Sequence, residues 1–172
     1  MPIVATDILL RLAGGSSNTV PDSSLGGVMS TSTVIVDNTL HNLFDVVSGT
    51  ESTAGDTEYR SFYVLNNHGT LAYQNAKIWI NSETTHTNEN VQISLAGEGA
   101  NTTMETIANE NTAPVSGGLS FQEAATEGAA LSLGTLNAGQ RYGIWVKRIT
   151  TAGCLAKDNY TVVINVKGDT SE

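Results

Sequence analysis

The 172-residue sequence has little cysteine, little charge and few aromatic side chains. Its one cysteine, Cys154, cannot form an internal disulfide, and no cysteine pair exists for a Cys-based zinc site. Charged residues make up 15% of the chain, below the ~25% of typical globular domains. Ser, Thr, Asn and Gly meet the solvent instead, which excludes a helical bundle and a highly charged disordered tail. The composition favours one β-rich domain with many turns.

Basic residues are also scarce. Eight Lys and Arg stand against seventeen Asp and Glu, for a net charge of −9, which argues against nucleic acid and an anionic membrane surface as partners. The net charge is −4 over residues 1–77, −7 over 78–140, where no base occurs, and +2 over 141–172. Two interpretations stay open: an acidic middle that meets the basic end of another copy, or a hydrated acidic loop face.

Long apolar runs are missing, so no segment is expected to span a bilayer. Residues Met1–Asp7 contain no basic stretch followed by an apolar core, the pattern of a secretory signal. We therefore expect a soluble protein that is made and folded in a cytoplasm.

Alternating apolar and polar residues predict most of the secondary structure. In Val91–Leu95 the apolar side chains fall on one face, and Tyr142, Ile144 and Val146 share a face of a later segment. The predicted strands cover 8–12, 58–65, 74–81, 91–95, 131–133, 141–149 and 160–166. About seven or eight strands with long Gly/Asn loops predict an all-β fold, an antiparallel β-sandwich.

The segments between these strands are less informative. Residues 13–33 hold few large apolar side chains, two glycine pairs and a proline, which predicts an extended arm or a long loop. As an arm, this segment would be loose in solution and would order on a neighbouring subunit. We therefore divide the chain into an N-terminal strand with a Gly/Ser-rich arm, 1–33, and a sandwich domain, 34–172. Residues 40–47 are expected to form a short helical turn or a packed loop, and 97–130 stay unassigned between loops, strands and a short helix.

The corner Leu136-Asn137-Ala138-Gly139 resembles the turn into the sixth strand of immunoglobulin-like bacterial domains. That resemblance implies an immunoglobulin-like sandwich in which 74–81 and 141–149 are neighbours in one sheet. Trp79 and Trp145 would then lie on its outer face, each beside a lysine, either as a partner-contact patch or simply covered by the lysine stems. The candidate partner contacts are Trp79, Trp145, Lys77, Lys147 and Leu25.

Residues for catalysis are sparse. The three histidines, His41, His68 and His86, stand far apart, and no serine-nucleophile or phosphate-loop motif is present. Segment 83–89 offers two carboxylates and an imidazole, and the Gly-Asp-x-Glu stretch 55–58 offers two carboxylates. Such loop residues are usually just hydrated. Cys154 has no base near it in sequence and is expected to be an inert thiol. We predict no catalytic residue, no metal, no cofactor and no enzymatic activity.

Several segments together resemble small structural proteins of tailed bacteriophages. The matching stretches are residues 7–15, 18, 21, 24–27, 42–49, 55–60, 74–80 and 167–170. The resemblance implies a capsid decoration (cement) protein on the virion surface. Its implied partners are the major capsid protein and further copies of this chain, with which it forms a homo-oligomer. The alternative is a tail, baseplate or receptor-binding component. The motifs are structural and imply no active site.

Overall fold

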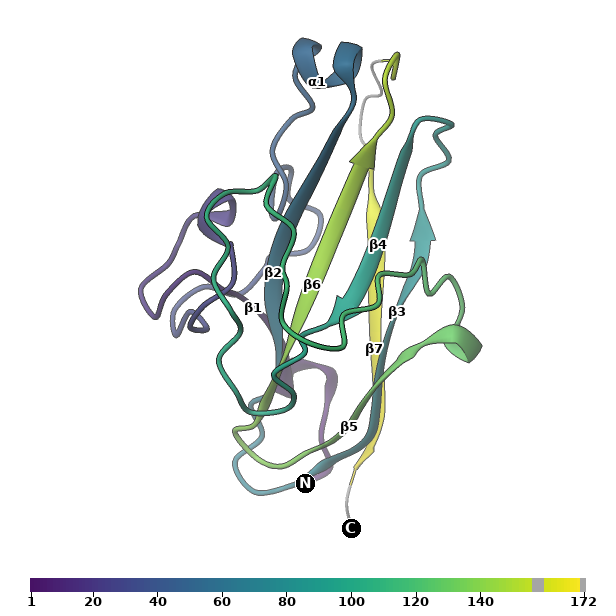
Figure 1. Cartoon of the computed structure of the whole chain (residues 1–172). Coiled ribbons are helices and arrows are strands. Elements are labelled where there is room, and N and C mark those ends of the chain that lie inside the picture. Colours follow the sequence, from purple (N-terminus) through teal and green to yellow (C-terminus); the bar gives the residue numbers. More distant parts are fainter. Residues whose placement is uncertain (156–159, 171–172) are drawn as a thin grey trace.

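The computed structural model describes residues 1–155 and 160–170 and shows a mostly β protein (Figure 1). Its strands are β1 (Ile8–Leu12), β2 (Asp56–Asn66), β3 (Tyr73–Glu83), β4 (Glu89–Leu95), β5 (Leu131–Leu136), β6 (Arg141–Thr150) and β7 (Val162–Thr170). Its helices are α1 (Gly49–Ala54) and the 3-10 turns η1 (Ala5–Asp7), η2 (Pro21–Ser23) and η3 (Glu127–Ala129). In the part of the chain described, no helix has the length and apolar character that a membrane crossing needs.

The strands form two antiparallel sheets, which confirms the all-β, sandwich-like prediction. One sheet has four strands in the order β1-β2-β6-β4, and the other has three in the order β5-β3-β7. The three-stranded sheet lies behind the four-stranded sheet in the view of Figure 1.

The predicted adjacency of 74–81 and 141–149 is wrong. β6 lies between β2 and β4, with a register that runs from Asp56↔Thr150 to Leu65↔Arg141. Both of its edges are therefore occupied, and β3 pairs with β5 and β7 in the other sheet. The constant-type immunoglobulin order would instead place the third, sixth and seventh strands together.

The main core lies between the sheets and follows the period of two along each strand. Phe62 and Val64 of β2 and Ile144 and Val146 of β6 point into it and are almost fully buried. The three-stranded sheet contributes Tyr73, Ala76, Ile78, Ile80, Leu133 and Leu136, and Trp79, although out of phase with Ile78 and Ile80, is buried in the same cluster. Burial of each large apolar side chain stabilises the fold by about 1.5–3 kcal/mol.

A second apolar cluster lies on the outer face of the four-stranded sheet, where loops 13–33 and 97–124 cover it. Its buried members are Ala13, Tyr63, Ala96, Met104, Ile107 and Trp145. The unassigned segment 97–130 is thus mainly loop, joined to the rest by isolated bridges and the short turn η3. Figure 1 shows the green loop 97–124 running in front of β2 and β6, with the purple segment 13–33 to the left of β2.

Of the two alternatives for residues 13–33, the structure shows the long loop and not a loose arm, because these residues are bonded closely to the sheet. Ser24 is fully buried; its Oγ accepts a hydrogen bond from Ala13 N (2.8 Å) and donates one to Ser61 O (2.6 Å). Gly26 has a φ of 84°, and a Cβ there would come within 1.9 Å of Glu105 O. Small residues therefore let this segment pack against its neighbours, where the sequence suggested freedom.

Candidate functional site

The two tryptophans among the candidate contacts are not on an outer surface. Trp145 is fully buried in the second cluster, under Gly26, and Trp79 is 7% exposed in the main core. The sequence pattern placed them opposite the apolar faces of their strands, but loops 13–33 and 97–124 cover the outer face at Trp145, and Trp79 packs with residues of the main core. The expectation that Trp79 and Trp145 are exposed partner contacts is therefore wrong.

The other three candidates lie at the surface but on different sheets. Lys77 of β3 forms an ion pair with Glu127 (2.7 Å), which Lys167 also contacts (2.8 Å). Hydrogen bonds from Lys167 and then Lys77 lower the pKa of Glu127 to about 2. Lys147 of β6 lies over the Phe121 ring, with Nζ 5.9 Å from its centroid.

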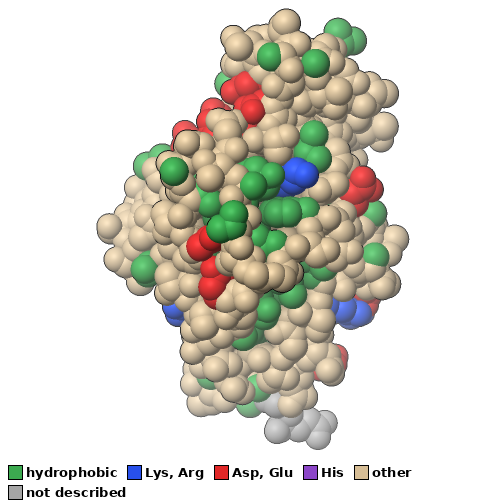
Figure 2. Space-filling model, viewed as in Figure 1, with side chains coloured by type: hydrophobic (Ala, Val, Ile, Leu, Met, Phe, Trp, Pro, Cys, Tyr) green, Lys and Arg blue, Asp and Glu red, His purple; other side chains and the backbone are tan. Residues whose placement is uncertain are grey.

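Leu25 and Lys147 share one face of the molecule with the buried Trp145. Leu25 is half-buried against the second cluster, as are Met29, Tyr59, Leu119 and Phe121. Figure 2 shows hydrophobic side chains gathered near the middle of this face, over β2 and β6, with few charges around them. The structure thus brings together three of the five candidates and separates Lys77 and Trp79 from them.

A stronger candidate is the anchored loop, which we define as residues 34–47 and which closes one side of the gap between the sheets. Leu43 is buried in the main core. Phe44 lies beside two guanidinium groups, with the carbon of Arg148 4.8 Å and that of Arg60 5.8 Å from its ring centroid. The packed-loop interpretation of this segment fits the structure. The short helix α1 begins later, at Gly49, and Ser48 caps it by accepting a hydrogen bond from Glu51 N.

Buried charges hold this loop in place. Arg148 Nε donates to Glu58 Oε2 (2.6 Å), and its Nη1 donates to the backbone oxygen of Asp45 (2.7 Å). Arg60 forms an ion pair with Glu110 on the other side. Burial raises the pKa of Glu58, and the neighbouring Arg148 opposes that shift.

The sequence does contain a signal for this cluster. Glu58 and Arg60 are in phase with Phe62 and Val64, and Arg148 is in phase with Val146, so all three charges point toward the inner face. A charge on an apolar face needs a buried partner. Which partner it finds depends on the loop, and that is not visible in the strand pattern.

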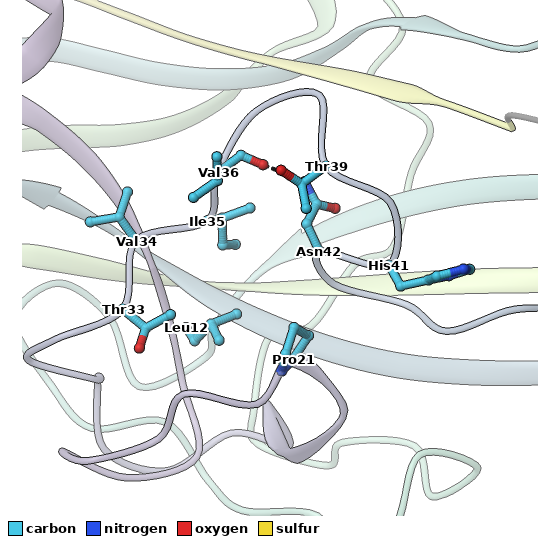
Figure 3. A pocket seen from close by; sticks show the side chains of 9 residues that line it. All are labelled: Leu12, Pro21, Thr33, Val34, Ile35, Val36, Thr39, His41 and Asn42. Atoms are coloured by element: carbon cyan, nitrogen blue, oxygen red, sulfur yellow. Dashed lines mark hydrogen bonds between the residues drawn. The ribbon is translucent and has the colours of Figure 1, made fainter.

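Some apolar side chains of the anchored loop are buried in the core and hold it in place, but others face the solvent. The exposed fraction is 63% for Val36, 68% for Leu40 and 66% for Val46. We call these three residues the apolar loop patch. Beside it is a small, mainly apolar pocket (Figure 3), lined by Leu12, Pro21, Thr33, Val34, Ile35, Val36, Thr39, His41 and Asn42. Asn42 Nδ2 donates to Val36 O (2.9 Å) and closes the loop.

Among residues 1–155 and 160–170, three groups of side chains have metal-ligand atoms within 4.8 Å of one another. They are Asp45, Glu58 and Glu110; Glu51, Asp56 and Glu58; and His86, Glu89 and Cys154. The guanidinium groups of Arg60 and Arg148 already form ion pairs with the carboxylates of the first group, and Glu58 of the second belongs to the same ion pair with Arg148. Among the residues that the structure describes, the third group forms no ion pair with a basic side chain other than its own histidine.

Cys154 has no base near it in sequence, but the fold brings a histidine close to it. Its Sγ lies 3.7 Å from His86 Nδ1, although the two residues are 68 positions apart. Burial raises the pKa of the thiol, and the carboxylate of Glu89 raises it further.

Comparison with protein-family models, with curated proteins and with solved structures finds no significant match. The geometry of the chain and the resemblance of its segments are therefore what a functional proposal rests on.

Proposed function

We propose that this chain is a non-enzymatic structural protein of the virion of a tailed bacteriophage, and that it decorates the head. In this role it binds the lattice of the major capsid protein from outside, alone or with further copies of itself, and stabilises that lattice. The protein is made in the host cytoplasm and ends on the capsid surface. The resemblance of its segments to phage structural proteins supplies the setting.

The apolar loop patch is the observation that carries the proposal. Val36, Leu40 and Val46 are each more than 60% exposed in a loop whose residues Ile35, Leu43 and Phe44 pack into or against the core. Exposed apolar side chains that gather on one element are typical of protein–protein contact sites. The ion pairs around Arg148 hold the loop before it binds, which reduces the entropy lost on association.

The net charge of −9 fits the same role. Like charges keep free copies apart in solution, so an apolar patch can stay exposed without causing self-association. On a lattice, contacts with the partner replace that repulsion.

Two measurements test the proposal. Purified particles should contain this chain in a fixed ratio near one per major capsid protein, or one per local symmetry axis. A handful of copies per particle would refute head decoration and favour the tail or baseplate alternative, and absence from particles would refute both.

The second measurement locates the contact. Deleting 1–33 would remove β1 and the buried Ser24, so point variants are the better test. We expect a variant in which Val36, Leu40 and Val46 are all serine to bind undecorated capsids at least tenfold more weakly. Val115→Ser, at an 85% exposed valine on a different loop, is the matched control and should bind as the original chain does. Unchanged binding of the triple variant would remove the patch from the proposal.

A further inference from the structure

At the end of the sandwich, the connection between β3 and β4 meets the connection between β6 and β7. His86 comes from the first connection, Glu89 is the first residue of β4, and Cys154 comes from the second connection. His86 Nδ1 is 3.7 Å from Cys154 Sγ and 3.9 Å from Glu89 Oε2. The three ligand atoms all lie within 4.8 Å of one another.

The geometry points to a transition-metal site, and we propose that His86, Glu89 and Cys154 bind one Zn²⁺ ion. A tetrahedral zinc ion has bonds of about 2.3 Å to sulfur, 2.0 Å to nitrogen and 2.1 Å to oxygen, so its ligand atoms lie about 3.4–3.6 Å apart. The observed separations of 3.7 and 3.9 Å exceed this by a few tenths of an ångström. Small side-chain movements therefore suffice, and a water molecule can take the fourth position.

The donor set selects the metal. A thiolate, an imidazole and a carboxylate suit zinc and similar ions, whereas Mg²⁺ and Ca²⁺ prefer oxygen ligands throughout. The three ligands are also shielded from solvent. The exposed fraction is 12% for the His86 side chain, 6% for that of Glu89 and 7% for Cys154.

Neighbouring hydrogen bonds hold the two connections in register. Thr151 N donates to Asn88 O (2.7 Å), and Glu89 pairs with Thr150 in the sheet. Ser52 Oγ donates to the backbone oxygen of Cys154. The ligands are thus positioned by backbone contacts that do not need the ion, which lowers the entropy lost when the ion binds.

The ring of His86 is oriented from the other side by Tyr160. The two rings are perpendicular, with centroids 6.4 Å apart. Tyr160 OH donates in turn to Glu83, whose Oε1 also accepts from Val91 N (2.9 Å). A bound ion would therefore join two connections, 84–88 and 151–154, that are otherwise linked by backbone bonds, and would stabilise this end of the sandwich.

Titration of the reduced, metal-free full chain with Co²⁺ tests the proposal, because a cobalt–thiolate bond gives an intense charge-transfer band. We expect one ion per chain, the band, and displacement by Zn²⁺. Cys154→Ser should lose the band, and His86→Gln should weaken Co²⁺ binding by at least about tenfold. His41→Gln, at an exposed histidine outside the cluster, is the matched control and should bind Co²⁺ normally.

Two outcomes would overturn the site: absence of a thiolate band in the original chain, or a band that survives in His86→Gln with unchanged affinity. Thermal unfolding gives a readout that does not depend on the serine variant being folded. Zn²⁺ should raise the Tm of the original chain and of His41→Gln but not of His86→Gln, and Mg²⁺ should raise none of them. Equal shifts in all three would refute the ligand assignment. These measurements use the isolated chain, so they are independent of capsid binding.

Discussion

Replacing Arg148 with methionine (Arg148→Met) would leave a carboxylate buried without its cation. Arg148 is 7% exposed and Glu58 is 1% exposed, so water cannot take over the role of the guanidinium without a rearrangement. The substitution also removes the hydrogen bond from Nη1 to the Asp45 backbone oxygen and the contact with the Phe44 ring. Methionine keeps much of the volume, so the loss is mainly electrostatic.

Removing one partner of a buried ion pair costs about 3–5 kcal/mol. We expect Arg148→Met to lower the free energy of unfolding by that amount, a large part of the roughly 5–15 kcal/mol of a typical domain. Urea unfolding followed by circular dichroism measures it. With an m-value of about 2 kcal/mol/M, a loss of 4 kcal/mol moves the midpoint by about 2 M urea.

The pH dependence gives a sharper test of the cause. In the original chain, burial raises the pKa of Glu58 and Arg148 lowers it. In Arg148→Met only the effects that raise this pKa remain. A carboxyl group with a raised folded pKa contributes stability below its unfolded pKa, and that stability is lost as the pH rises through the folded pKa. The deficit of Arg148→Met should therefore be largest at neutral pH and smaller near pH 5, at about the upper end of ordinary carboxyl titration.

Two results would refute this reasoning. One is a loss of less than about 1 kcal/mol, the range of an exposed pair. The other is a deficit that does not change with pH. The double variant with Glu58→Gln removes the stranded charge and should recover part of the loss, whereas purely additive effects would show that the two side chains do not interact.

Three further predictions can be checked by the same urea experiment. Gly26→Ala should lose about 2–4 kcal/mol, because it combines a strained φ with a clash against Glu105 O, and a neutral result would contradict the close packing of that segment. Ser24→Ala should lose about 1–3 kcal/mol, because it leaves the buried Ser61 O without its hydroxyl donor; an unchanged midpoint would mean that another donor replaces it. Glu127→Gln should leave the midpoint nearly unchanged, because its ion pairs are exposed, and a large shift would show that they support the fold.

The strands could be predicted from the sequence because the pattern of a strand is local. The alternation of 91–95 predicts β4, and that of Tyr142, Ile144 and Val146 predicts β6. The same local logic left 13–33 open between a loose arm and a long loop, because apolar residues are scarce there. Small residues in fact allow a close approach between backbones, and Gly26 packs against Glu105 there.

The candidate site was harder to predict from the sequence, because it depends on contacts between distant segments. Alternation places Trp79 and Trp145 on a face of their strands, but only the loops decide whether that face meets solvent. The anchored loop depends in the same way on Arg148, which is 103 positions from Asp45.

The scarcity of cysteine, charge and long apolar runs by itself determined the class of fold, since composition and a period of two are properties of the chain alone. The lone Cys154 shows what the tertiary structure decided. In the sequence no base is near this thiol. The pairing of β4 with β6 brings the segment of Cys154 beside His86 and beside Glu89 at the start of β4. Chemistry between side chains requires contact within a few ångströms, and the folding of both sheets, which the local pattern does not specify, creates that contact.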